Sequence, residues 1–395
     1  MPSLLGACSS SVLADPFTAF TEAREQSPVA RLVAPGYAFW AVTRHEEARA
    51  LLTDPRLRTN ENTFMLRPDV PEHCLKYMRT MSEMNGAEHL RLRRLVAPAF
   101  TPRKAAEFAP RIERIVEGLL DELTEHLAED GTVDLLAHFA RPMPMEVICE
   151  LAGIPAVDRT RWREMGAAVA AGHGDKYRDA IPGVMEGAEA AVARGRTAPG
   201  DDLISELARI QQEDGDRLSE DELVTLVWTL VVAGQTPTNL IANAVAALLG
   251  HREQLAGLRA DPALMPRAVE ELMRWCGPQL LTFPRFATED VEIGGVLVPK
   301  GEPVVASIAS ANRDPRVFDE PGRFDLRREA SGQLGFAHGA HFCAGAPLAR
   351  VQTGIALDAL LRRFPGLSPA GELRQTRDPG TWRLSALPVL LRPAG

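Results

Sequence analysis

The clearest chemical signal in the chain is a cysteine in a ten-residue segment near its end, FAHGAHFCAG at 336–345. A cysteine that ligates a metal does so as a thiolate, and the charge on its sulfur needs nearby N–H donors. A helical pattern with an apolar stripe follows at 347–364. The start of that helix would supply N–H donors and a favourable dipole, so Cys343 is a candidate metal ligand.

The other residues of this segment fit a flat metal cofactor. Gly339 and Gly345 would let the backbone approach such a cofactor without Cβ clashes. Phe336, seven positions before the cysteine, would pack on the cofactor, and His341, two positions before it, could reach an anionic group at the edge. Together these residue types predict a haem-thiolate loop with Cys343 as the iron ligand.

Two other interpretations of Cys343 are open at this point. A lone cysteine is commonly a buried small hydrophobic residue. A zinc site could use His338, His341 and Cys343, but the sequence offers no obvious fourth ligand at zinc-like spacing. The zinc interpretation also leaves the two glycines and Phe336 without a role.

This loop resembles the haem-binding signature of the cytochrome P450 family, the haem-thiolate monooxygenases, and the resemblance extends over most of the chain. Glu271 and Arg274, in ELMR, match the E-x-x-R pair of the family. Their spacing puts an acid and a base on one helix face, where they can form a buried ion pair. The family adds a third member from a later loop, and Arg323 fits that place. Taken alone, such a pair is an ordinary surface pair on a helix.

The resemblance also implies a clamp for the two haem propionates. His89 and Arg93, in HLRLRR, lie four residues apart and share one helix face. Arg285 and His341 match the other two propionate positions of the family. Several cationic or N–H donors suit two partly buried carboxylates, because an unpaired buried charge is costly. By itself, an arginine-rich helix is more often a solvated face.

The segment LVVAGQTPTN at 230–239 resembles the long helix that crosses the haem, where the family usually reads A-G-x-acid-Thr. Here Thr236 stands at the acid position and Pro237 at the alcohol position, so both usual members of the proton-delivery pair are missing. Pro237 removes a hydrogen bond to the carbonyl of Ala233, and the helix should open there. The alternative is a proline kink without mechanistic consequence.

An opening beside Ala233 and Gly234 would leave room for dioxygen and an ordered water, held by a side chain of this segment or by a substrate group. The residues expected to take part in catalysis are Gln235, Thr236, Pro237 and Thr238. Those expected to line the substrate pocket are Ala233, Gly234, Leu281 and Thr282.

The periodicity of the chain is mostly helical, with apolar residues at three- and four-residue spacing over 112–127 and 218–249. Strand-like patches are short and are clearest at 39–43 and 291–305. We therefore expect a mainly α protein with a small β-rich region, the cytochrome P450 fold. No linker, charge block or repeat divides the chain, so 1–395 should form a single domain.

Two polar segments, 60–85 and 172–200, are rich in loop-forming residues and are candidate lids over the substrate pocket. The formal net charge of −9 argues against nucleic acid as a partner. No apolar run reaches the eighteen or so residues of a membrane span, so we expect no membrane association. The five cysteines are scattered and odd in number, which is consistent with a reducing cytoplasm.

The resemblance implies haem b as the cofactor, with electrons from a ferredoxin and its reductase, since no flavin domain is fused to the chain. It implies hydroxylation or epoxidation of a small hydrophobic organic substrate, in the tailoring of secondary metabolites. The missing acid–alcohol pair raises the alternative of oxidative C–C or C–N coupling or ring closure without oxygen insertion. A non-catalytic haem sensor is the remaining alternative.

Overall fold

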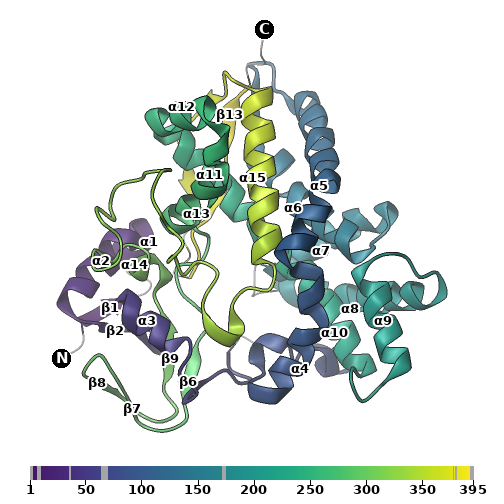
Figure 1. Ribbon diagram of the computed structural model, residues 1–395, viewed down its shortest axis with the longest axis horizontal. Helices are drawn as coiled ribbons and strands as arrows, with labels where there is room; N and C mark the ends of the chain where they lie inside the picture. Colours follow the sequence, from purple (N-terminus) through teal and green to yellow (C-terminus); the bar gives the residue numbers. More distant parts are fainter. Residues whose placement is uncertain are drawn as a thin grey trace.

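The computed structural model confirms the mainly helical architecture. The strands of the largest sheet gather on one side of the molecule, a strand at 388–390 lies near the C-terminus beside the helix at 346–363, and the longer helices fill the centre and the other side (Figure 1). The structure describes residues 3–6, 10–34, 37–63, 70–170, 175–376, 378 and 380–391.

The largest sheet has six strands in the order β1 (Ser3–Gly6), β2 (Val29–Ala34), β3 (Tyr37–Val42), β9 (Pro303–Ala306), β6 (Arg285–Ala287) and β4 (Leu57–Arg58). The strand predicted at 39–43 is β3, which pairs in parallel with β9 in the register Trp40 to Val304. The patch predicted at 291–305 contains the hairpin β7 (Val291–Ile293) and β8 (Val296–Val298), followed by β9. Arg285, a candidate site residue, is thus fixed at the start of a paired strand.

The helical core is built around α5 (Pro102–Leu123), which contains most of the predicted 112–127 helix, and α15 (Ala346–Arg363). These two helices pack side by side, and α15 also contacts α11 (Pro237–Gly250) and α13 (Met265–Cys276) (Figure 1). The Thr101 hydroxyl caps α5 by accepting from the Lys104 N–H at 3.2 Å. The apolar stripe of α5 is buried at Ile112, Val116, Leu120 and Leu123.

The remaining helices and strands surround this core. They are α1 (Ser10–Ala14), α2 (Pro16–Gln26), α3 (His45–Leu51), α4 (Gly86–Val96), α6 (Pro142–Ala152), α7 (Ala156–Ala170), α8 (Asp175–Thr197), α9 (Leu203–Glu213), α12 (Arg252–Ala260), α14 (Ile308–Ala311), β5 (Thr132–Asp134), β10 (Ser368–Pro369), β11 (Arg374–Gln375), β12 (Leu384–Ala386) and β13 (Pro388–Leu390).

The helix predicted over 218–249 is two helices, α10 (Glu220–Ala233) and α11. A capping box between Ser219 and Glu222 begins α10. Pro237 has no N–H to donate to the Ala233 carbonyl, which accepts instead from the Thr236 N–H at 3.1 Å. The opening expected at the proline is therefore present, as a tight turn over residues 234–236.

Together, α10 and α11 correct one expectation. The segment Glu220–Gly250 is long and apolar enough to cross a membrane by length and composition. However, 56% of its apolar window is buried inside the protein, as in a helix of a globular core. A short turn at residues 234–236 divides the segment into the two helices.

The segment 172–200 was expected to be loop-rich, and for residues 175–197 that prediction is wrong, because they form α8. Its glycines are helical contact points. A Cβ at Gly187 would lie 3.1 Å from the ring of Trp162 in α7, and one at Gly195 would lie 3.2 Å from Ile204 in α9. Residues 172–174 lie outside the described residues.

The other candidate lid, 60–85, contains two 3₁₀ segments, Glu72–Tyr77 and Met81–Glu83, and its residues 64–69 lie outside the described part. Tyr77 connects this segment to the helices beneath it. Its hydroxyl lies 2.6 Å from a carboxylate oxygen of Glu189 in α8, and its carbonyl accepts from the Trp228 indole N–H of α10 at 3.1 Å.

Candidate functional site

Cys343 lies between the 3₁₀ turn Gly339–His341 and the start of α15. Its backbone N–H donates to the Phe336 carbonyl at 2.9 Å, which closes the loop. Cys343 is exposed to solvent, although many protein atoms lie around its sulfur. A Cβ added at Gly345 would meet no atom within 4 Å, so the loop borders open space on this side.

Backbone N–H groups from the start of α15 are directed at the Cys343 sulfur, as the sequence predicted. Burial raises the pKa of the thiol, while hydrogen bonds from Gly345 and Ala346 and the positive charges of Arg93 and Arg350 act in the opposite direction. Burial has the largest effect, so the net shift of the pKa favours the protonated thiol. Binding of a cation to the sulfur would reverse that preference, because metal ligation releases the proton.

Phe336 packs against protein as well as facing the loop. It is 6% exposed and belongs to a cluster with Leu240 of α11, Met273 of α13, and Ala346 and Ala349 of α15. The guanidinium of Arg350 lies over its ring, 4.5 Å from the centroid. Phe336 therefore joins the cysteine loop to α11, close to the break that precedes this helix.

Gly339 is required by the protein itself. Its φ is +75°, and a Cβ there would lie 2.6 Å from the Leu52 carbonyl oxygen. The close approach at the end of α3 thus excludes a side chain at this position. Ala337, two residues earlier, has φ +60°, a conformation that costs a residue with a Cβ about 1–2 kcal/mol.

Ala337→Gly is expected to stabilise the protein by roughly 0.5–1 kcal/mol. Glycine relieves the left-handed strain but adds conformational entropy to the unfolded chain. The measurement is the denaturant midpoint of the purified protein. Ala256→Gly, at an exposed position inside α12, is the matched control and should destabilise by up to about 1 kcal/mol. A lower midpoint for Ala337→Gly would show that the alanine is not strained.

Four basic residues predicted for the propionates lie together next to the cysteine loop. The rings of His89 and His341 are 4.2 Å apart, and Arg93 and Arg285 act on His341 electrostatically. Burial, then His89, Arg285 and Arg93, lower the pKa of His341 to about 4, and burial lowers the pKa of Arg285 to about 10. Within the described ranges, neither Arg93 nor Arg285 has an ion-pair partner. Such a cluster favours a bound anion.

The zinc interpretation finds no support in the described part of the chain, where no three His, Cys, Asp or Glu side chains are placed to hold a metal ion. His338 accepts a hydrogen bond at Nε2 from Arg49 Nε at 3.2 Å. The side chain of His338 is thus used to attach the loop to α3.

Glu271 and Arg274 form a completely buried pair, with side chains 0% exposed and N–O distances of 2.6 and 2.8 Å. The surface-pair alternative is therefore wrong. The third member is also corrected: Arg328 Nε lies 3.3 Å from Glu271, whereas the Arg323 side chain pairs with Glu320 at 3.2 Å. Arg323 contributes only its carbonyl, which accepts from Arg274 at 3.3 Å.

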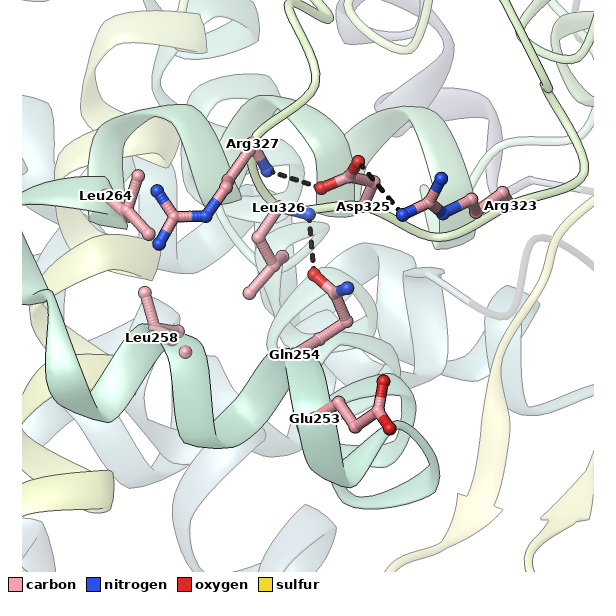
Figure 2. Close-up of a pocket in the computed structure, with 9 residues that line it drawn as sticks. Glu253, Gln254, Leu258, Leu264, Arg323, Asp325, Leu326 and Arg327 are labelled. Carbon is pink, nitrogen blue, oxygen red and sulfur yellow. Dashed lines mark hydrogen bonds and ion pairs between the residues drawn. The ribbon is translucent and has the colours of Figure 1, made fainter.

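The Arg323 side chain belongs to a surface pocket of about 240 Å³ that Figure 2 shows. Asp325 lies between Arg323 and Arg327, and Gln254 of α12 accepts from the Leu326 N–H at 3.0 Å. Among the predicted site residues, only Arg323 lines this pocket. The side chain points to solvent because the loop turns outward before Arg328 returns to Glu271.

The helix break separates the predicted catalytic residues into two groups. Thr236 and Ala233 are exposed, whereas Pro237 and Thr238 are buried and the Gln235 amide nitrogen is covered. Leu240, four residues after Thr236 and on the same helix face, packs in the Phe336 cluster. The exposed face of the break therefore leads towards the cysteine loop.

The predicted pocket residues Leu281 and Thr282 lie in the segment before β6. Leu281 is half-buried, and the Thr282 hydroxyl accepts from the Ala306 N–H at 2.9 Å, so it is used inside the sheet. The next residue, Phe283, is 56% exposed and was missed. An exposed aromatic side chain just before β6 and Arg285 is a better candidate for substrate contact than Thr282.

An iron porphyrin with two carboxylates fits these residues. An exposed thiol with N–H donors stands beside a basic cluster whose arginines, Arg93 and Arg285, have no ion-pair partner among the described residues. The exposed Thr236 lies one helical turn before Leu240 of the Phe336 cluster. Residues 258–388 match the sequence family described as Cytochrome P450. The chain is 39% identical over 394 residues to the cytochrome P450 monooxygenase PikC of Streptomyces venezuelae, covering 98% of this chain and 94% of that protein.

The chain belongs to the cytochrome P450 family. Its structure is similar to that of the P450 PksS of Bacillus subtilis 168, with a TM-score of 0.89, 32% identity, and coverage of 98% and 99% of the two chains. It is also similar to CxnD, a P450 for C–S bond formation in chuangxinmycin biosynthesis, with a TM-score of 0.87, 33% identity, and coverage of 100% and 99%. The predicted fold is confirmed.

Family membership also confirms the enzyme class. The chain is a P450 monooxygenase related to enzymes that tailor secondary metabolites, and its cofactor is a haem iron. P450 enzymes take electrons from redox partners and act on organic substrates. The basic cluster and the cysteine loop are therefore the part of the molecule where cofactor contacts are to be sought.

Proposed function

We propose that this P450 hydroxylates or epoxidises a small hydrophobic organic substrate, using haem b and electrons from a ferredoxin and its reductase. It acts as a single domain in the cytoplasm. The observation that carries the proposal is the exposed Cys343 thiol, with N–H donors from Gly345 and Ala346, beside a buried basic cluster.

Cys343 would ligate the iron as a thiolate, with the N–H groups of Gly345 and Ala346 stabilising the sulfur charge. His89, Arg93, Arg285 and His341 would bind the two propionates. The guanidinium charges of half-buried Arg93 and buried Arg285 have no ion-pair partner in the described chain, so binding two anions removes an electrostatic cost. The imidazoles of His89 and His341, whose pKa values are lowered by burial, would donate N–H groups to the same carboxylates. When bound, the haem supplies dioxygen activation with electrons that arrive one at a time.

Proton delivery needs a different arrangement from the usual acid and threonine. Thr236 is the only one of the four predicted catalytic residues with an exposed side chain, so its hydroxyl is the group that can hold an ordered water. A hydroxyl or amine of the substrate would complete the path. Gln235, Pro237 and Thr238 would act by shaping the break and not by touching that water.

Oxidative coupling or ring closure is the second candidate. Thr236 and Pro237 replace the acid and alcohol that the family usually has, and this departure from the usual sequence raises the alternative. Similarity to CxnD, which is described as forming a C–S bond, adds to it. C–C or C–N joining would remove two hydrogens from the substrate, and with two electrons from the redox partner both atoms of dioxygen would leave as water, so no oxygen is added to the product.

Product mass distinguishes the two reactions. With the substrate, a ferredoxin, its reductase and labelled dioxygen, we expect a product that contains one labelled oxygen atom. A product lighter than the substrate by two hydrogens, without label, would establish coupling instead. Because the substrate is not identified, a spectral binding screen of oxygenated polyketides, peptides and indoles comes first. Loss of product when ferredoxin is omitted checks the electron donor.

A further inference from the structure

The turn between α10 and α11 is held from two sides by neighbouring helices. A Cβ at Gly234 would lie 2.6 Å from the Cβ of Ile148, so α6 packs directly on the turn. A Cβ at Gly166 of α7 would lie 1.7 Å from the side-chain nitrogen of Gln235. Two consecutive residues of the turn are therefore fixed by close approach, one to each helix.

The Gln235 carboxamide occupies the space that a side chain at position 166 would take. Its nitrogen is buried and has no hydrogen-bond partner in the part of the chain that the structure describes. The methyl group of Met145 in α6 also borders this niche and lies 3.2 Å from the position of a Cβ on Gly166. A buried donor without an acceptor is unfavourable, so packing against Gly166, not hydrogen bonding, keeps the amide there.

This packing decides which side chains of the turn are exposed. With Gly234 and Gln235 directed towards α6 and α7, Ala233 and Thr236 are left on the exposed face. If the Gln235 side chain left the niche, its amide would compete with the Thr236 hydroxyl for any water on that face, because the glutamine side chain is longer than that of threonine. A glycine at position 166 is therefore required for the amide to stay away from the reacting groups.

We propose that Gly166 and Gln235 are positioning residues for Thr236. Gly166 provides the niche that holds the Gln235 amide, and this contact fixes the turn so that the Thr236 hydroxyl alone serves the oxygen side of the site. The inference rests on the proposed role of Thr236 in proton delivery. It assigns a mechanistic role to α7, which contributes no residue to the predicted site.

Gly166→Ala tests the niche, because its methyl group expels the amide without touching cofactor or substrate. We expect coupling, the amount of product formed per reducing equivalent, to fall roughly tenfold, because small misplacements of reacting groups have effects of this size. More of the electrons should then be released as peroxide. Haem content and the thermal midpoint should stay near wild type. Gly118→Ala, inside α5 and with no atom within 4 Å of its Cβ, is the matched control and should leave coupling unchanged.

The double variant decides whether the two residues act together. Gln235→Ala should lower coupling less than Gly166→Ala, because no displaced amide then competes with the Thr236 hydroxyl for water. Adding Gly166→Ala to Gln235→Ala should cause no further loss, since only the flexible end of Met145 then lies near the new methyl group. If Gly166→Ala alone fails to fold and the double variant folds, the niche is supported in the same way.

Three results would overturn the inference. Normal coupling in Gly166→Ala, or losses that multiply in the double variant, would show that the amide is not held by Gly166. If either of these results is obtained but Thr236→Ala is uncoupled, only the role of Gly166 is refuted and the proposed role of Thr236 stands. Normal coupling in Thr236→Ala, measured with the same substrate and redox partners, would overturn both the proposed role of Thr236 and the positioning role of Gly166 and Gln235.

Discussion

Cys343→Ala is expected to abolish the red-shifted Soret band that marks a thiolate ligand in the reduced, carbon-monoxide-bound protein. The reason is local: this sulfur is exposed, and the N–H groups of Gly345 and Ala346 are directed at it. Losing a hydrogen-bond partner of a metal ligand lowers activity by up to about 100-fold. Losing the ligand itself should lower turnover by more than this. The measurements are the carbon monoxide difference spectrum and product yield.

Cys276→Ala is the matched control. That thiol is buried and donates to the Leu272 carbonyl at 3.2 Å, and burial raises its pKa to about 12. Unlike Cys343, it has no exposed side from which a cofactor could be reached. It should keep the red-shifted band. Cys343→Ser should lose the band but retain more haem than Cys343→Ala, because a hydroxyl can still approach iron. A surviving band in Cys343→Ala would refute the assignment of the ligand.

The sequence was sufficient where a function depends on a few neighbouring residues. The cysteine loop, the helix after it and the opening at Pro237 follow from local chemistry: a thiolate needs N–H donors, and proline removes one hydrogen bond. The pair Glu271 and Arg274 is also local, since three residues on a helix place both side chains on one face.

Prediction failed where the path of the chain in space decides the outcome. Arg323 and Arg328 stand five residues apart in the same loop, and nothing local shows which of them turns back to Glu271. The glycines of α8 were read as loop residues, but Gly187 and Gly195 serve close contacts between helices. Likewise, the direction of the Gln235 side chain depends on α7, which lies about seventy residues earlier in the sequence.

Glu271→Ala is expected to destabilise the protein by roughly 3–5 kcal/mol and to yield little haem-loaded enzyme. The carboxylate accepts from Arg274, from Arg328 at 3.3 Å and from the Asp325 N–H at 3.0 Å, so its loss leaves two buried guanidinium groups without a counter-charge. The measurements are haem content and the denaturant midpoint. Glu320→Ala breaks an exposed pair with Arg323 and should cost less than about 1 kcal/mol.

The comparison of Arg328→Ala with Arg323→Ala tests the corrected triad itself. Arg328→Ala removes the contact with Glu271 and hydrogen bonds to the carbonyls of Asp319, Glu320 and Arg323, so it should lower the midpoint almost as much as Glu271→Ala. Arg323→Ala keeps the carbonyl that Arg274 uses and removes only an exposed side chain, so its effect should be small. Equal losses in the two variants would mean that both side chains support the buried pair, and the geometry that separates them would then be wrong.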